Sequence, residues 1–196
     1  MTQQLQNITY SGQKIDDIDT FDILPDFLKD FYLSQNGFVA FNGGFHFRGC
    51  VKTPKWHSIK EIWFGDIKLS RLFASVDIND IPFAQDCFGD QFLIRKNTIL
   101  RLSSETDEIL DLGIDFNGFL NQIYNNPFEF LNIDNIDIPG LKPGQLINVI
   151  PPFCVKADKG YSFKPIDMIE QIRFLSEFSK QIKDLPNGTM IDFKIE

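Results

Sequence analysis

The sequence has few of the side chains on which most metal sites and acid–base catalysts depend. Its 196 residues include two His and three Cys. Cys50, Cys87 and Cys154 are widely spaced and form no CxxC pair, which argues against a structural zinc site and favours buried free thiols. A pairing of Cys50 with His46 or His57, as a metal site or an activated thiol, is the less common alternative. We expect no metal and no cofactor.

Long apolar runs are also missing. Asp, Lys, Asn or Gly interrupts the most apolar stretches within about ten residues, short of the roughly 18 to 20 that span a bilayer. The first seven residues lack the basic start and apolar core of a secretory signal. The net charge of −8 has the wrong sign for attraction to nucleic acid or anionic lipid. We therefore expect a cytoplasmic protein that binds neither.

The motifs of common enzyme classes are absent too. The sequence contains no P-loop, no GxGxxG after a strand and no GxSxG, and the Gly-rich stretch 42–44 is expected to be a turn. Two groups of acids could in principle bind calcium or flank a glycosidic bond: Asp86 with Asp90, and Asp107 with Asp111 and Asp115. Neither matches the calcium-loop pattern, and solvated surface acids are the usual explanation. We expect the chain not to be an enzyme.

What the sequence does have is a large apolar content, with 43% hydrophobic residues and 21 Phe, enough for the core of one domain. Apolar residues from Leu24 to Tyr32 recur at spacings of three and four, which predicts a helix that ends at Asn36-Gly37. Short aromatic and β-branched runs predict strands over 38–41, 45–47, 59–64 and 72–76. A meander of three strands is expected over 82–86, 91–95 and 98–102, with a tight turn at Gly89.

Beyond Leu102 the strands are expected to give way to helix. Asp115 is a suitable N-cap for a helix that must end before Pro127. The Pro- and Gly-rich residues 134–160 predict an irregular connector with one strand over 145–150. A long amphipathic helix is expected over 165–185, and an alternating run over 191–195 favours a terminal strand. These elements divide the chain into a polar arm (1–19), an α+β domain (20–132), and a connector with a helix that packs on the same domain (133–196).

Charge is distributed unevenly along the chain. Residues 102–141 contain eight acids and no Lys or Arg, which matches the whole net charge of −8. Residues 47–71, by contrast, carry an excess of Lys and Arg. If the acidic stretch forms one helical face, that face attracts basic proteins; an ordinary solvated face is the alternative.

Three segments occur in an order that resembles the SUKH superfamily. They are the helix from Leu24 to Tyr32 with Asn36-Gly37, the Phe83-Ala84-Gln85-Asp86 hairpin with Gly89, and the Phe-rich segment Ile114 to Tyr124. The resemblance covers residues 20–132. Residues 141–154 are similar to a C-terminal extension of longer bacterial members. The resemblance implies a single α+β domain, with a mixed, largely antiparallel curved sheet flanked by helices and a C-terminal helical extension.

For bacterial members the resemblance implies an immunity protein that binds and neutralises a toxin, often a nuclease delivered by type VI or contact-dependent secretion. The leading hypothesis is thus a non-enzymatic protein that docks a basic toxin domain. The expected contact residues are four acids of the helical face (Asp107, Glu108, Asp111 and Asp115), two nearby aromatics (Phe83 and Phe88) and the hairpin acid Asp86. Asp86 could instead cap the turn of its hairpin. A regulatory or scaffolding module that binds an endogenous protein or small ligand is the alternative, and a carboxylate-based hydrolase ranks third.

Overall fold

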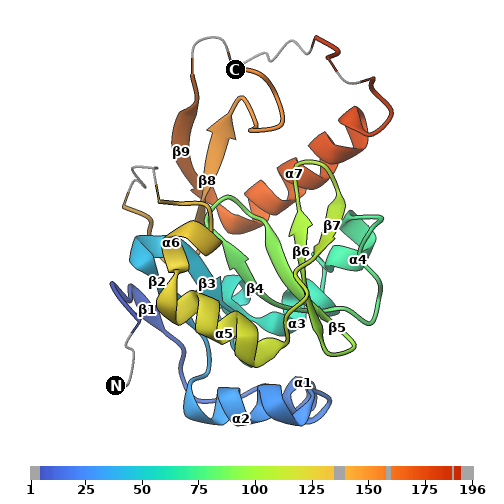
Figure 1. The fold of residues 1–196 in the computed structure, drawn as a ribbon. Coiled ribbons are helices and arrows are strands. Elements are labelled where there is room, and N and C mark those ends of the chain that lie inside the picture. Colours follow the sequence, from blue (N-terminus) through green and yellow to red (C-terminus); the bar gives the residue numbers. More distant parts are fainter. Residues whose placement is uncertain (1–4, 135–139, 158–159, 187, 191–196) are drawn as a thin grey trace.

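A seven-stranded antiparallel sheet forms the centre of the computed structural model, which describes residues 5–134, 140–157, 160–186 and 188–190 (Figure 1). Its strands lie side by side in chain order, so the sheet is one continuous meander. They are β1 (Tyr10–Ser11), β2 (Phe38–Ala40), β3 (Phe45–Phe47), β4 (Ile81–Asp86), β5 (Gln91–Arg95), β6 (Thr98–Ser103) and β7 (Glu108–Asp111). A separate hairpin joins β8 (Gln145–Ile150) to β9 (Ser162–Asp167). The only parallel pairing among the described residues is an isolated bridge between Gly49 and Ser58.

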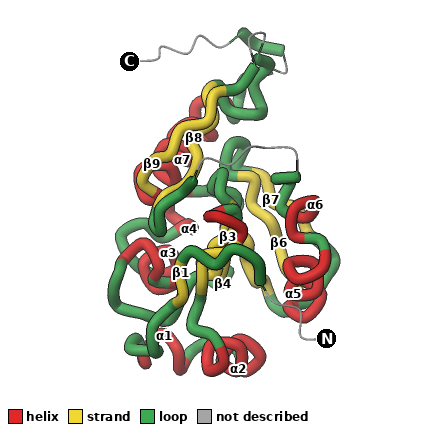
Figure 2. Tube along the Cα trace, turned by 90° about the vertical axis from the view of Figure 1, so that its left-hand side faces the viewer, coloured by secondary structure: helices red, strands yellow, loops and turns green. Residues whose placement is uncertain are grey.

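Helices cover both faces of the sheet, as Figure 2 shows for α5 and α6 on one side and α3 and α4 on the other. The first face carries α2 (Asp26–Ser34), α5 (Phe116–Asn125) and α6 (Pro127–Phe130). The second carries α4 (Leu69–Leu72) and α7 (Met168–Ile182), and α3 (Ile59–Trp63) contributes to both apolar clusters. Three short helical segments, α1 (Ile18–Asp22), η1 (Phe41–Gly43) and η2 (Lys55–His57), complete the α+β domain.

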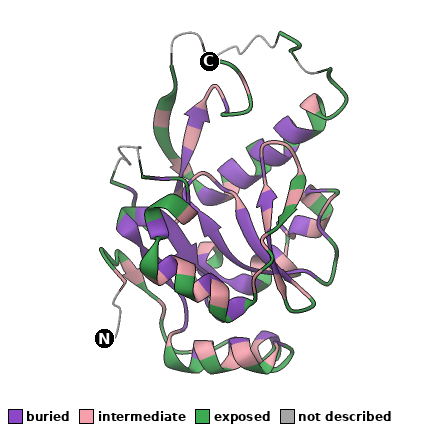
Figure 3. Ribbon diagram, in the orientation of Figure 1, coloured by how far each residue is buried: buried purple, intermediate pink, exposed green. Residues whose placement is uncertain are grey.

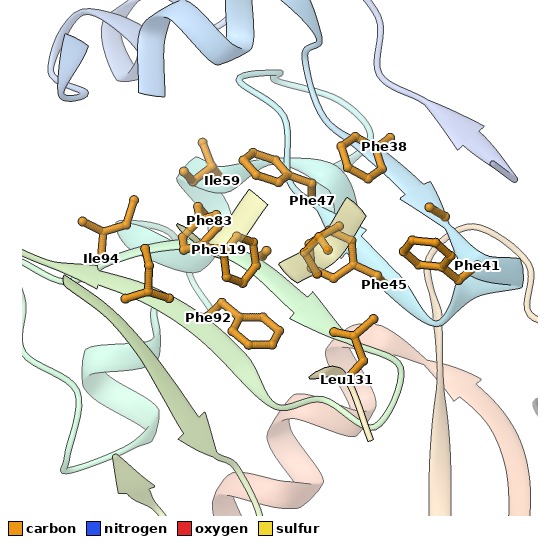
Figure 4. Packing of buried hydrophobic residues seen from close by; sticks show 14 of the residues in the cluster. Phe38, Phe41, Phe45, Phe47, Ile59, Phe83, Phe92, Ile94, Phe119 and Leu131 are labelled. Carbon is orange, nitrogen blue, oxygen red and sulfur yellow. The ribbon is translucent and has the colours of Figure 1, made fainter. Parts of the chain in front are cut away.

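The alternation of side chains along each strand divides the core in two. Phe92 and Ile94 point to the first face, whereas Leu93 points to the second. The larger cluster is built from phenylalanines of neighbouring strands and of α5 (Figure 4), and the Phe119 ring lies 5.0 Å from the Phe83 and Phe92 rings. Both faces of the central strands β4 and β5 are therefore buried, so these strands lack the alternation of apolar and polar residues that a half-exposed strand shows.

Several predicted elements are confirmed. These are the helix near residues 24–36 (α2), the β4–β5–β6 meander, helix α5 with Asp115 as its N-cap, and strand β8. The long C-terminal helix begins at Met168 rather than Pro165, because 162–167 pair with β8 and the Asp167 carboxylate caps the helix. The strand predicted over 191–195 lies outside the described residues.

Two predicted strands are wrong, because 59–64 and 72–76 fall on helices α3 and α4 and the turn after α4. Ile59 and Ile62 are both buried three positions apart, which is a helical spacing that a six-residue run is too short to reveal. The helix expected directly beyond Leu102 is also wrong. The chain instead turns back at residues 104–107 and forms β7, with Asp107 in the left-handed conformation at φ 56°.

Residues 10–19, assigned from the sequence to a polar arm apart from the α+β domain, are packed against that domain. Tyr10 and Ser11 pair with β2. Asp17 is buried and accepts a 2.8 Å hydrogen bond from the Thr20 hydroxyl in α1. In the part of the chain that the structure describes, no helix is long and apolar enough to cross a membrane.

Candidate binding surface

Strand β7 forms one edge of the sheet and is exposed along most of its length (Figure 3). Glu108, Leu110 and Asp111 are exposed, and the Leu110 side chain retains 62% of its accessible surface. Ile109 is half-buried and packs against the apolar cluster of the second face. This edge therefore combines two acids, one exposed apolar side chain and a fixed position on the sheet.

The four acids predicted to share a helical face do not do so, because only Asp115 adjoins a helix. Asp115 accepts a 2.8 Å hydrogen bond from the Gly118 N–H and caps α5. Asp107 lies in the β6–β7 turn, and Glu108 and Asp111 lie on β7. The prediction of an acidic helical face is wrong, and its acids lie on and around a strand edge.

Asp107 ties the β6–β7 turn to the segment after α4. Its carboxylate accepts hydrogen bonds from the N–H groups of Ala74 and Ser75, at 2.9 and 3.1 Å, and from the Ser75 hydroxyl at 2.6 Å. With its carboxylate oxygens engaged in this way, Asp107 acts first as a structural residue. It fixes the end of β7 nearest the turn.

Replacing Asp107 with Ala is expected to lower the free energy of unfolding by about 1 to 3 kcal/mol, because it leaves three donors without their acceptor. Urea denaturation followed by circular dichroism measures the change. Glu108→Ala is the matched control, since this neighbouring acid is exposed and should change stability by no more than about 0.5 kcal/mol. Equal stabilities for the two variants would contradict the structural role of Asp107.

Phe83 is fully buried, so its expected place in a partner contact is wrong. Its ring packs against the rings of Phe47 and Phe119, with centroids 5.3 and 5.0 Å away. The large volume of Phe83 fills the core between β4 and α5, where no partner can reach it.

Asp86 is also fully buried, and its expected contact with a partner is wrong. One carboxylate oxygen accepts hydrogen bonds from the N–H groups of Phe88, Gly89 and Asp90, and the other accepts one from Arg101 at 2.8 Å. Asp86 thus organises the β4–β5 turn, the role that its place in the hairpin favoured over a partner contact. Burial and the neighbouring Asp90 carboxylate raise the pKa of Asp86 to about 7, although Arg101 and the N–H donors oppose the shift.

Phe88 does reach the surface, as part of an aromatic group formed by Phe88, Phe153, Tyr161 and Phe163. The Phe153 ring lies 5.1 Å from Phe88, 5.2 Å from Tyr161 and 6.2 Å from Phe163. Phe153 and Tyr161 keep 39% and 41% of their accessible surface. Sequence reasoning missed both, because they follow β8 and reach Phe88 only through tertiary packing. The aromatic group therefore leaves apolar surface available for contact.

Glu105 joins the aromatic group to the β6–β7 turn. Its carboxylate accepts hydrogen bonds from the N–H groups of Phe153 and Cys154, at 2.9 and 2.8 Å. Burial raises the pKa of Glu105, and the two N–H donors oppose that shift. The turn that leads into β7 is thus held directly against the loop that presents Phe153. We refer to β7, this turn and the aromatic group together as the β7 surface.

A second polar cluster lies inside the protein, around the fully buried Arg48. Its guanidinium donates to the Pro82 and Ala84 carbonyls, both at 3.1 Å, and to the side-chain oxygens of Gln85 and Gln91 at 2.6 and 2.5 Å. These partners are neutral, and burial lowers the pKa of Arg48 to about 9. The cluster connects the end of β3 to β4 and β5.

The two histidines extend this cluster. His46 and His57 stack with their rings 5.2 Å apart, and the His46 Nε2 lies 2.9 Å from the His57 Nδ1. Burial, the chief cause, lowers the pKa of His57 to about 4 and that of His46 well below its usual value. Both imidazoles are therefore neutral at pH 7, and both side chains are buried.

The pH dependence of stability tests this arrangement. Because folding depresses the imidazole pKa, the unfolded chain takes up protons first as the pH falls below about 6.5. The folded state therefore has its full histidine contribution to the free energy of unfolding above about pH 6.5, and it loses that contribution as the pH falls towards 4. Asp86 acts in the opposite direction over nearly the same range, because folding raises its pKa. The histidine contribution is therefore read from the difference between wild type and a His46→Gln/His57→Gln variant.

Wild type is expected to be more stable than this variant at pH 7, and the gap should narrow by at least about 2 kcal/mol at pH 4.5, because both imidazoles contribute. Chemical denaturation at both pH values measures the gap. A gap independent of pH would show that the imidazoles titrate alike in the folded and unfolded chain.

The three cysteine thiols all have raised pKa values. Burial raises the pKa of Cys50 and of Cys154 to about 12, and that of Cys87 in the same direction, so the reactive thiolate is scarce at pH 7. Within the described ranges, no three His, Cys, Asp or Glu side chains are grouped to hold a metal ion. A cavity of about 690 Å³ between β1 and the end of α2 is lined by Lys14 and Tyr32 but by no carboxylate.

The comparisons with known proteins add no identification: no family model matches the chain, and no curated protein matches it.

Proposed function

We propose that this chain is an immunity protein that binds a basic toxin domain of the nuclease class through the β7 surface and so neutralises it. The observation that carries the proposal is the exposed edge strand with Glu108 and Asp111 at its two ends. The family resemblance given above supports the class of function. The resemblance and the edge strand are independent of each other.

Charge supports a basic partner. Residues 102–141, which include β7, contain eight acids and no Lys or Arg. A surface of one sign speeds the encounter with a partner of the opposite sign, and dissolved salt weakens that attraction. Nucleases carry basic surfaces because their substrates are polyanions. An acidic inhibitor can occupy such a surface in place of the substrate.

Apolar side chains supply the anchors that such a complex needs. Charges at the rim of an interface mainly affect association rate and specificity, whereas buried aromatic and aliphatic side chains hold most of the affinity. Leu110 on β7 and the exposed parts of Phe153 and Tyr161 provide this kind of area. They are joined through the β6–β7 turn by the hydrogen bonds of Glu105.

The experiment is neutralisation of the toxin domain encoded by the reading frame beside this gene. Co-expression of the chain should restore growth of cells that make the toxin, and the purified proteins should bind more weakly as salt rises from 0.05 to 0.5 M. An unrelated cytosolic protein of similar net charge is the control. Growth arrest despite co-expression, or a neighbouring frame without a toxin, would favour the alternative of a regulatory or scaffolding module.

A further inference from the structure

The outer side of β7 carries backbone groups that no strand pairs in the part of the chain that the structure describes. The Leu112 N–H donates to the Ile99 carbonyl at 3.0 Å, and the pairing register continues from there along β6 and β7. Hydrogen-bonded and non-bonded pairs alternate in an antiparallel ladder, so Leu110 and Glu108 direct their backbone groups to β6. Ile109 and Asp111 consequently direct their N–H and C=O groups away from the sheet.

This edge is preformed. The Asp107 carboxylate holds one end of β7 to Ser75, and the Asp111 carboxylate accepts a 2.8 Å hydrogen bond from the Gly113 N–H at the other. The Ile109 side chain packs into the second apolar cluster and prevents the strand from turning over. A partner strand would therefore meet a backbone already in the extended conformation, so little ordering opposes binding.

We propose that the partner docks by strand addition: an extended, basic segment pairs with β7 and becomes an eighth strand of the sheet. The inference rests on the proposed function and adds its mode of contact. The backbone of the added strand bonds to Ile109 and Asp111. Side chains of the added strand meet Glu108 and Leu110 on one face of the sheet and Asp111 on the other. Lys or Arg is therefore favoured at the positions of the added strand that lie opposite the two acids.

Charge selects a basic segment over a second copy of this chain. Pairing of two β7 strands would bring the Glu108 and Asp111 carboxylates of both copies to the same edge, and like charges across neighbouring strands repel. A strand with Lys or Arg removes that repulsion and gains attraction. The same two acids thus disfavour self-association and favour the basic partner.

Hydrogen exchange measured by NMR tests the proposal with a defined probe, a capped octapeptide of Val and Thr that carries Lys at two positions three residues apart, so that one Lys faces Glu108 and the other faces Asp111. At millimolar peptide, exchange of the Ile109 and Asp111 amides should slow by about tenfold, while Leu110, whose N–H already faces β6, should change little. A peptide N-methylated on its β7-facing residues, and one with Glu in place of Lys, should give no protection. No binding, protection elsewhere, or equal protection by the N-methylated peptide would overturn strand addition.

Two variants at one position separate charge from backbone pairing. Asp111→Asn removes the charge and keeps the outward N–H, whereas Asp111→Pro removes both without breaking a bond to β6. The proline variant should lose peptide protection completely and toxin neutralisation with it, and the asparagine variant should keep part of each. Full neutralisation by the proline variant would overturn strand addition but leave the proposed function standing. Failure of wild type to bind the toxin would overturn the proposed function, whatever the peptide does.

Discussion

Arg48→Ala is expected to leave most of the chain unfolded at 25 °C. The guanidinium is fully buried, and its removal takes a donor from four acceptors on β4 and β5, of which the Gln85 side-chain oxygen keeps a second donor, the Gln91 amide at 3.2 Å. Each unsatisfied buried group costs about 1 to 3 kcal/mol, so the sum is comparable to the roughly 5 to 15 kcal/mol that stabilises a whole domain. The side chain also fills volume in the core, and the resulting cavity adds to the loss. Urea denaturation followed by circular dichroism measures the effect.

Arg173→Ala is the matched control for this variant, because Arg173 is exposed on α7 and its loss should change stability by no more than about 0.5 kcal/mol. Arg48→Lys keeps the charge but presents fewer donors, so it should fall between wild type and Arg48→Ala. A denaturation midpoint for Arg48→Ala equal to that of wild type would show that water replaces the guanidinium without cost.

Charge reversal at both acids of β7 is expected to have the largest effect on binding. In Glu108→Lys/Asp111→Lys the edge becomes basic, so attraction to a basic toxin turns into repulsion, and affinity should fall by about 100-fold or more at low salt. Most of the loss in association rate should disappear at high salt, where exposed charges are screened. Both side chains are exposed, and the change removes the hydrogen bond from the Gly113 N–H to the Asp111 carboxylate, so circular dichroism must first show that the double variant is folded. Surface plasmon resonance with immobilised toxin measures both rates.

The matched control reverses two acids far from β7. Asp22→Lys/Asp30→Lys changes net charge by the same amount, in helices α1 and α2 at the lower end of the molecule in Figure 1. Its affinity should stay within about threefold of wild type, because charges beyond the Debye length contribute little at physiological salt. Equal losses in the two variants would mean that overall charge, and not the β7 surface, governs binding.

Local sequence signals predicted those elements whose determinants lie close together in the chain. The spacing of apolar residues and the Asn36-Gly37 pair were sufficient to predict helix α2, and Asp115 marked the start of α5. Gly89, at φ 103°, gave the turn between β4 and β5. The segment 59–64 failed because a short apolar run fits helix and strand equally well. Only its packing, with Ile59 and Ile62 both buried, decides between them.

The site was harder to predict because its parts depend on distant contacts. Acid spacing alone placed Asp107 to Asp115 on a helix, but the left-handed conformation of Asp107 sends the chain back along β6 as a strand. Phe153 lies 65 residues from Phe88 in the sequence yet packs against its ring. Arg48 likewise bonds to Gln85 and Gln91, 37 and 43 residues further on. No local pattern reports contacts of this kind.

The most direct test of neutralisation by binding is a titration of toxin activity with this chain. A binding inhibitor removes activity in proportion to the amount added, so activity should fall linearly and reach zero at one equivalent when the toxin concentration is well above the dissociation constant. An enzyme that inactivates the toxin would abolish activity at a small fraction of an equivalent. We predict the endpoint at one equivalent; complete inactivation far below it, or full activity at a large excess, would contradict the account.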